Sequence, residues 1–254
     1  MFICVLAKAA TETINWYVDD NVYATTSCQT GGDIILPTSP LKYGYTFHGW
    51  VEYVFLEYIE STGTQYIDTG IKANSAYTYK FKVKRTSPYN SNIWGVKTNS
   101  SFSANSCIIL GWTGPAQIGI YSHEGSDTGS NPYVVDWGTD YHTIEFNPTS
   151  KKLIIDGVDR WSDLENGCLT NENWSSNTYN LYLGGTNTVG SFVGGGVSTW
   201  AQYEVWNNNG VLIQNLIPAK RNSDNAVGMY DLVSGQFFTN AGTGEFIAGP
   251  VINQ

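Results

Sequence analysis

Carboxylates are the residues of this chain with the clearest potential for acid–base chemistry. Their spacing determines whether two of them can act together on one substrate. Glycoside hydrolysis needs two carboxyl groups on one surface, one acting as acid and the other as nucleophile or base. Glu57 and Glu60 are close in sequence, but their odd spacing on a strand directs them to opposite faces. Glu145 and Glu204 each stand alone in a strand-like segment. We therefore expect no catalytic carboxylate pair and no enzyme activity.

The histidines and glycines show no arrangement typical of a catalytic or phosphate site. His48, His123 and His142 follow neither a His-x-x-x-His spacing nor a Ser-His-Asp order. The glycine-rich stretch 184–196 is not followed by Lys-Ser or Lys-Thr, so we expect hairpin and loop glycines there.

Calcium is the one metal for which the sequence offers ligands. Four aspartates lie in or near turns and could supply oxygen atoms: Asp127, Asp156, Asp159 and Asp163. Asp156 is better explained by the turn that it forms with Gly157. We expect no resident cofactor.

Aromatic side chains beside polar ones offer a different chemistry, the recognition of sugars. Sugar rings stack their C–H faces on Trp and Tyr, while their hydroxyls hydrogen-bond to Asn and His. Most Trp of an aromatic-rich sandwich fill its core, so we expect one or two of the candidates to be exposed. The candidate carbohydrate-binding residues are Asn92, Trp94, Trp112, Tyr121, His123, Asn173 and Trp174.

These candidates must be positioned by strands, because the apolar pattern is that of β-structure. In residues 143–146 apolar and polar side chains alternate, Leu153-Ile154-Ile155 follows a Pro-containing turn, and Asp156-Gly157 is typical of a type I′ hairpin. These segments predict an antiparallel meander. Residues 77–84 alternate strictly, with lysines on the polar side, which is also typical of an edge strand.

Composition and charge exclude several classes of partner. The chain has 254 residues with 14% aromatic and 14% charged residues, which suits strands and tight turns. The formal net charge of −9 disfavours binding to nucleic acid, and no apolar stretch is long enough to span a bilayer.

The four cysteines do not form a metal or redox motif. Cys4, Cys28, Cys107 and Cys168 include no C-x-x-C pair. The cysteines can form disulfides if the protein is exported. Cys107, which lies within an apolar run, is equally typical of a reduced core residue.

The meander and its surroundings resemble laminin-G-like domains of the concanavalin A-like lectin/glucanase superfamily. The similarity rests on Lys152-Leu153-Ile154-Ile155-Asp156-Gly157-Val158, Leu181-Tyr182-Leu183-Gly184-Gly185 and Leu216-Ile217-Pro218-Ala219-Lys220, and covers roughly residues 55–250. It implies a jelly-roll β-sandwich. The Glu-x-Asp-x-x-Glu string of the superfamily's enzymes is absent from this sequence, which argues against a glucanase.

A second resemblance concerns residues 13–53. The phrase Gly44-Tyr45-Thr46-Phe47-His48-Gly49-Trp50 resembles the Listeria–Bacteroides repeat, a small β-grasp-like module of bacterial surface proteins. Its usual context implies export.

The apolar start of the chain has two interpretations. Residues 1–12 are either the remnant of a leader or a strand, and the strand is favoured because the apolar run is short for a signal peptide. Phe2 to Leu6 could then pair with a sheet edge of the same or a neighbouring chain.

Together these features predict an all-β protein with an apolar N-terminal segment (1–12), a small β-grasp-like module (13–53) and an antiparallel jelly-roll β-sandwich (54–254). We expect an extracellular, cell-surface or virion-associated protein that binds a glycan or another cell-surface partner without catalysis. The alternative is a structural subunit of a surface filament or phage fibre, and a glucanase-like hydrolase is third.

Overall fold

The computed structural model describes residues 11–18, 21–29, 34–41, 52–85, 92–97, 106–110, 117–123, 135–136, 140–163 and 178–252. For residues 106–110, 117–123 and 135–136 it describes the backbone alone. The chain divides into two compact units, residues 1–53 and 54–254, and each is described by itself.

The described part of the first unit is a β-hairpin. Strand β1 (Thr11–Val18) pairs antiparallel with β2 (Asn21–Gln29), and Trp16 Nε1 donates a hydrogen bond to Thr26 Oγ1 at 2.8 Å. The Gly44–Trp50 phrase and the apolar residues 1–10 lie outside the described residues.

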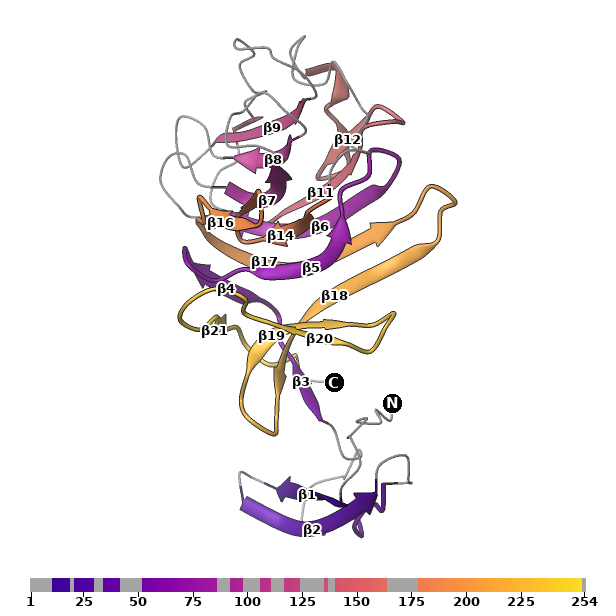
Figure 1. Ribbon diagram of the computed structural model, residues 1–254, viewed down its shortest axis with the longest axis vertical. Helices are drawn as coiled ribbons and strands as arrows, with labels where there is room; N and C mark the ends of the chain where they lie inside the picture. Colours follow the sequence, from indigo (N-terminus) through magenta and orange to yellow (C-terminus); the bar gives the residue numbers. More distant parts are fainter. Residues whose placement is uncertain are drawn as a thin grey trace. The chain divides into compact units, whose positions relative to one another are not determined.

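The second unit contains two sheets that lie face to face (Figure 1). The larger sheet has eleven strands, with the central order β13-β12-β11-β6-β17-β18-β19-β20 and with β3, β4 and β21 paired beside it. Its strands are β3 (Tyr53–Phe55), β4 (Ile59–Thr62), β6 (Thr78–Arg85), β11 (His142–Asn147), β12 (Lys152–Ile155), β13 (Val158–Asp159), β17 (Val197–Trp206), β18 (Leu212–Arg221), β19 (Val227–Asp231), β20 (Phe237–Thr239) and β21 (Ile247–Ala248).

The smaller sheet has eight strands in the order β10-β9-β8-β7-β14-β5, with the β15–β16 hairpin joined to β7. Its strands are β5 (Ile67–Lys72), β7 (Asn92–Lys97), β8 (Ser106–Leu110), β9 (Gln117–His123), β10 (Val135–Asp136), β14 (Asn180–Leu183), β15 (Thr186–Thr188) and β16 (Ser191–Val193). The expected hairpin glycines are confirmed, since Gly190 forms the β15–β16 turn at φ +85°.

The predicted meander is present as β11, β12 and β13. Ile144 and Phe146 point into the core, opposite Ile155 and Leu153 of β12. Asp156 at φ +50° and Gly157 at φ +81° form the turn to β13, as a type I′ hairpin requires.

The alternation of β6 predicts its buried face correctly, but its predicted place at the edge of the sheet is wrong. Tyr79, Phe81 and Val83 are buried, and the lysines lie on the other face. However, β6 is not an edge strand, because it pairs with β11 on one side and β17 on the other. Its lysines reflect a solvated outer face rather than an exposed edge.

Aromatic rings fill the space between the sheets. Trp94 of β7 contacts Tyr79 and Phe81 of β6 at centroid distances of 5.1 and 5.5 Å. Phe81 also lies 5.8 Å from the Trp200 ring and 6.4 Å from the Tyr203 ring of β17. These contacts confirm an all-β sandwich with one shared core.

Strand β17 changes its alternation halfway along. Trp200 lies opposite Val83 of β6, whereas Gln202, rather than Ala201, lies opposite Lys82. This β-bulge moves the buried positions from even to odd numbers, so Trp200, Tyr203 and Val205 all face the core. Gln202, Glu204 and Trp206 consequently face outward.

Helical structure is minor in the described part of the chain, where a 3₁₀ turn at Trp161–Asp163 is the one helical element. No helix among the described residues has the length and apolar character needed to cross a membrane.

Candidate functional site

The sequence-predicted sugar-binding residues with described side chains are buried. Trp94 has no exposed surface and lies in the core, so its assignment to a binding surface is corrected. Asn92 is 7% exposed, and its amide lies close to Gly194, whose carbonyl accepts a hydrogen bond from the Asn92 N–H. Trp94 therefore presents no surface to a sugar, and Asn92 presents little.

The other candidates lie beyond the described side chains. Tyr121 and His123 belong to β9, of which the backbone alone is described, and Trp112, Asn173 and Trp174 lie outside the described residues. Strands β7, β8 and β9 are neighbours in the smaller sheet, because β7 pairs with β8 and β8 with β9.

Aromatic residues also lie on the outer face of the smaller sheet beside β5 and β14, where their rings are stacked on one another. Tyr66 lies between Tyr182 and Phe192, with centroid distances of 4.4 and 4.5 Å. Burial, with the nearby Tyr66 and Asp68, raises the pKa of Tyr182 to about 12. Both faces of the Tyr66 ring are thus occupied, and the stack holds the β15–β16 hairpin against β5 and β14.

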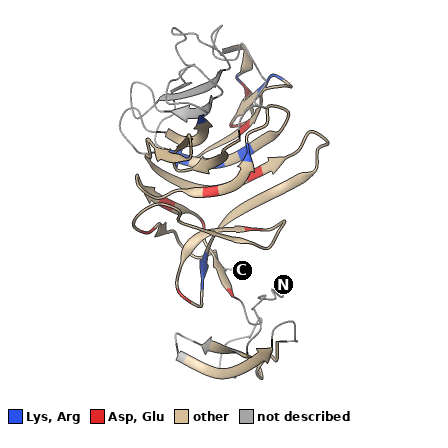
Figure 2. Cartoon of the chain, viewed as in Figure 1, with Lys and Arg blue, Asp and Glu red and all other residues tan. Residues whose placement is uncertain are grey.

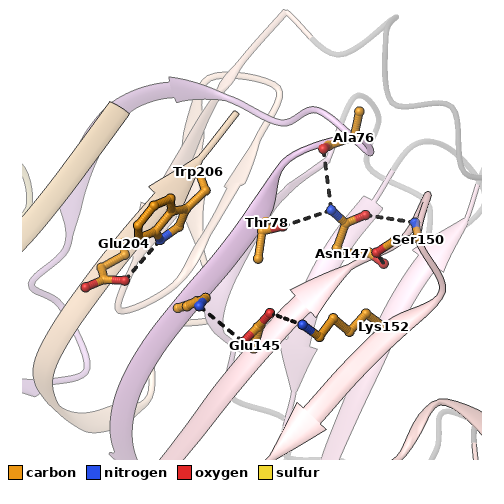
Figure 3. A network of polar contacts seen from close by, with 9 residues as sticks. Ala76, Thr78, Glu145, Asn147, Ser150, Lys152, Glu204 and Trp206 are labelled. Atoms are coloured by element: carbon orange, nitrogen blue, oxygen red, sulfur yellow. Dashed lines mark hydrogen bonds and ion pairs between the residues drawn. The ribbon is translucent and has the colours of Figure 1, made fainter. Parts of the chain in front are cut away.

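The outer face of the larger sheet carries a polar network instead (Figure 3). Lys80 of β6 lies directly opposite Glu145 of β11 on one side and Glu204 of β17 on the other. Lys80 Nζ is 3.3 Å from Glu145 Oε2, and Lys152 Nζ of β12 is 2.5 Å from Glu145 Oε1. Figure 2 shows basic and acidic positions next to one another on these strands.

The two lysines keep Glu145 ionised. Partial burial acts to raise its pKa, but hydrogen bonds and charge interactions with Lys152 and Lys80 outweigh this effect and lower the pKa. The Glu145 side chain is 21% exposed, whereas those of Lys80 and Lys152 are 41% and 42% exposed. A carboxyl group in this setting accepts hydrogen bonds and does not act as an acid near neutral pH.

Glu204 is held by donors from its own strand. Gln202 Nε2 donates to Glu204 Oε1 at 2.8 Å, and Trp206 Nε1 donates to Glu204 Oε2 at 3.1 Å (Figure 3 shows the second bond). Lys80 Nζ lies 5.5 Å from the centroid of the Trp206 ring, which is a cation–π distance. All four side chains are partly exposed.

Asn147 fixes the end of this face. Its Nδ2 donates to Thr78 Oγ1 at 2.9 Å, and its Oδ1 accepts the Ser150 N–H at 2.9 Å in the turn after β11 (Figure 3). These bonds hold the β11–β12 turn against the start of β6.

The aspartates considered for calcium are occupied by local bonds where they are described. Asp156 Oδ2 lies 2.5 Å from His142 Nδ1, and its Oδ1 accepts the Thr143 N–H; Asp159 accepts the Trp161 N–H. Asp127 and the Asp163 side chain lie outside the described residues. Within the described ranges, no three His, Cys, Asp or Glu side chains gather as metal ligands.

The structure corrects one premise of the sequence argument. Glu145 and Glu204 share one face of the larger sheet, on either side of Lys80, so a same-face carboxylate pair exists. Sequence reasoning missed it because β11 and β17 are far apart in the chain and the bulge in β17 hides its alternation. Two carboxyl groups that flank a lysine, with an indole beside them, suit the binding of hydroxyl-rich ligands.

Comparisons with known proteins give little further information. No family model and no curated protein match the sequence. Among solved structures, the chain is similar to one described as "NanB plus Optactamide", with 12% identity over 76% of this chain and a TM-score of 0.38. The present chain spans 39% of that chain's length, and the similarity assigns neither family nor activity.

Proposed function

We propose that this chain is a non-catalytic glycan-binding protein that binds saccharide on the outer face of the larger sheet. The larger unit would be a laminin-G-like sandwich, in keeping with the motifs in residues 152–158, 181–185 and 216–220. The binding surface, called the Glu204 face below, comprises Lys80, Glu145, Gln202, Glu204 and Trp206.

The observation that carries the proposal is the network around Glu204. Gln202 and Trp206 hold this carboxylate in one orientation before any ligand arrives, so little side-chain entropy is lost on binding. A carboxylate oxygen has acceptor capacity for more than one donor, and a sugar hydroxyl is a suitable second donor. The partly exposed Trp206 ring beside it offers an apolar surface for a sugar C–H face.

A site of this type binds weakly by itself. A few hydrogen bonds and one ring must offset the freedom that the ligand loses, so we expect millimolar to micromolar dissociation constants, about 4–8 kcal/mol. Display of many copies on a surface would increase retention through avidity.

The electrostatics of the face support binding rather than hydrolysis. Glycosidases keep one carboxyl of the pair protonated by raising its pKa. Here Lys152 and Lys80 lower the pKa of Glu145 instead. Glu145 is therefore a fixed anion that orients Lys80.

Export to a cell surface or virion belongs to the same proposal. It rests on the resemblance of residues 44–50 to surface-protein repeats and on the apolar residues 2–6, which would pair with a sheet edge. Removal of residues 2–6 should then lower the melting temperature or dissolve oligomers. Unchanged values of both would exclude the strand pairing.

A glycan array with the whole chain, presented in many copies, tests the binding function. Glu204→Gln and Trp206→Ala should each reduce the affinity for the best glycan at least tenfold, because each removes one part of the network. Glu245→Gln is the matched control, since Glu245 is exposed and lies away from this face in the segment before β21. Circular dichroism spectra of all variants check that they fold.

Two results would overturn the proposal. The wild-type chain could retain no glycan on the array, which would favour the rival role of a structural subunit in a filament or fibre. Alternatively, Glu245→Gln could weaken binding as much as Glu204→Gln, which would show that net charge rather than the Glu204 face governs retention.

A further inference from the structure

The lysines of β6 have different neighbours, although they share one face. Lys80 lies between two carboxylates, Glu145 and Glu204. Lys82, two residues further along β6, lies between Thr143 of β11 and Gln202 of β17, neither of which carries a charge. Lys84 lies opposite Thr199, whose hydroxyl is 3.4 Å from Glu60 Oε2. Lys82 is exposed, whereas Lys80 and Lys84 are partly buried.

Across the strands from Lys82, beyond Thr143, the next carboxylate already has hydrogen-bond partners of its own. Asp156 lies beyond Thr143, where it accepts hydrogen bonds from the Thr143 N–H and hydroxyl and pairs with His142. Thr143 therefore separates Lys82 from an anion that has its own partners. The ammonium of Lys82 is held by a neutral group instead, since it lies 5.6 Å from the centroid of the Tyr141 ring.

Tyr141 keeps that neutral character over a wide pH range. Burial, followed by the proximity of Tyr58, Glu60 and Glu57, raises the pKa of Tyr141 to about 12. Its ring lies 6.4 Å from the Tyr58 ring, so the ring beside Lys82 is itself packed against a second aromatic side chain. A cation that rests on an aromatic ring keeps its remaining donors for a ligand.

We propose that Lys82 is an anion subsite of the Glu204 face and selects glycans that carry an acidic sugar. This inference rests on the proposed glycan-binding function and names its ligand class. The carboxylate of the sugar would accept hydrogen bonds from the Lys82 ammonium, beside Thr143 and Gln202. Its hydroxyls would reach Glu204, which lies two residues from Gln202, or about 7 Å along the strand.

The charge of the whole chain makes this local arrangement selective. A protein with a net charge of −9 repels anions at long range, so an acidic ligand is best met by a cation that has no carboxylate directly opposite it on either neighbouring strand. At physiological salt, interactions between exposed charges are screened beyond about 8–10 Å. Direct contact with Lys82 therefore decides the preference for an acidic over a neutral glycan.

Matched glycan pairs test the subsite. The whole chain is titrated with a neutral oligosaccharide, with the same oligosaccharide capped by a carboxylate-bearing sugar, and with its sulfated form. We expect wild-type protein to bind the carboxylated form at least tenfold more tightly than the neutral one. Lys82→Gln should abolish that preference and leave the affinity for the neutral form unchanged, whereas Lys82→Arg should keep most of it.

Lys72→Gln is the control for charge, because Lys72 is exposed on β5 of the smaller sheet and its replacement changes the net charge equally. Equal gains for the sulfated and carboxylated forms, both lost in Lys82→Gln, would assign the subsite to anions in general and support it. Equal binding of neutral and acidic forms, with Glu204→Gln still harmful, would refute the subsite and leave the glycan-binding function standing. Binding of none of the glycans would refute both.

Discussion

The outer faces of the two sheets differ strongly where their side chains are described. On the smaller sheet, Tyr66 is enclosed between Tyr182 and Phe192, and the β15–β16 hairpin closes over the strands. On the larger sheet, Glu145, Lys80 and Glu204 form a charged row that remains partly exposed. In this chain stacked aromatic side chains seal a surface, whereas polar side chains with one indole beside them leave a surface open to solvent.

Removal of a ring from the sealed face should have the largest effect on folding. Phe192→Ala should reduce the free energy of unfolding by about 2–3 kcal/mol, because its contact with Tyr66 and its packing against Gly185 and Gly195 are lost. Urea denaturation measures the change, with the exposed neighbour Ser191→Ala as control. A loss below about 0.5 kcal/mol would show that the hairpin does not seal this face.

A methyl group added beneath that ring should have a slightly smaller effect. A Cβ atom at Gly195 would lie 2.4 Å from the Phe192 ring and 2.3 Å from the backbone oxygen of Gly63. Because the oxygen cannot rotate away, Gly195→Ala should cost about 1–3 kcal/mol.

The same denaturation experiment measures the cost of Gly195→Ala, with Gly210→Ala as a contrast. Gly210 lies in the turn between β17 and β18, and a Cβ there meets no atom within 4 Å, so its cost comes from its φ of +72° alone. A tolerated alanine at Gly195 would mean that the sealed face is looser than the packing indicates.

On the open face, a change of one hydrogen bond should hardly affect folding. Trp206→Phe keeps an aromatic ring but removes the Nε1–H that binds Glu204, and we expect a loss of about 1 kcal/mol or less. The same variant should weaken glycan retention, which array binding measures in parallel. If stability falls as far as in Phe192→Ala, the open face is structural and the contrast between the sheets fails.

The smallest effect on stability should come from the ionisation of Asp156. Partial burial acts to raise its pKa, but the Thr143 N–H, His142 and the Thr143 hydroxyl outweigh it and lower the pKa. Folding then favours the ionised form, so this group stabilises the fold above its unfolded pKa of about 3.9 and loses that contribution as the pH falls further.

Asp156→Asn should therefore be slightly less stable than wild type at pH 7 and should approach it in acid. The Asp156 side chain is 48% exposed, which screens the interaction and keeps the difference small. Asparagine also tolerates the positive φ of this turn, so the variant keeps its backbone. Thermal melts from pH 7 to pH 3 measure the difference, and a constant gap at all pH values would contradict the linkage.

The fold could be predicted from local patterns because alternation and turn chemistry act over a few residues. Tyr79, Phe81 and Val83 alternate with lysines, and Asp156-Gly157 determines its own turn, so strands β6, β11 and β12 could be placed from sequence.

The site could not be predicted in the same way. Every residue of β7, from Asn92 to Lys97, is buried, so alternation there does not distinguish a core Trp94 from an exposed one. The row of Glu145, Lys80 and Glu204 depends on strand order, which brings together residues that are distant in the chain. A single sequence does not show which strands pair with one another, so it holds no local signal that brings these three residues together.

The bulge at Ala201 has a consequence for how this surface can change during evolution. Ala201 is the extra residue of β17, so its deletion would leave Trp200 opposite Val83 and Gln202 opposite Lys82, with Tyr203 in the core and Glu204 outside as before. A change of length by one residue elsewhere in the strand would instead turn the residues beyond it to the opposite sides of the sheet. The bulge is therefore a position at which β17 can lose a residue without exchanging its core for its proposed binding face.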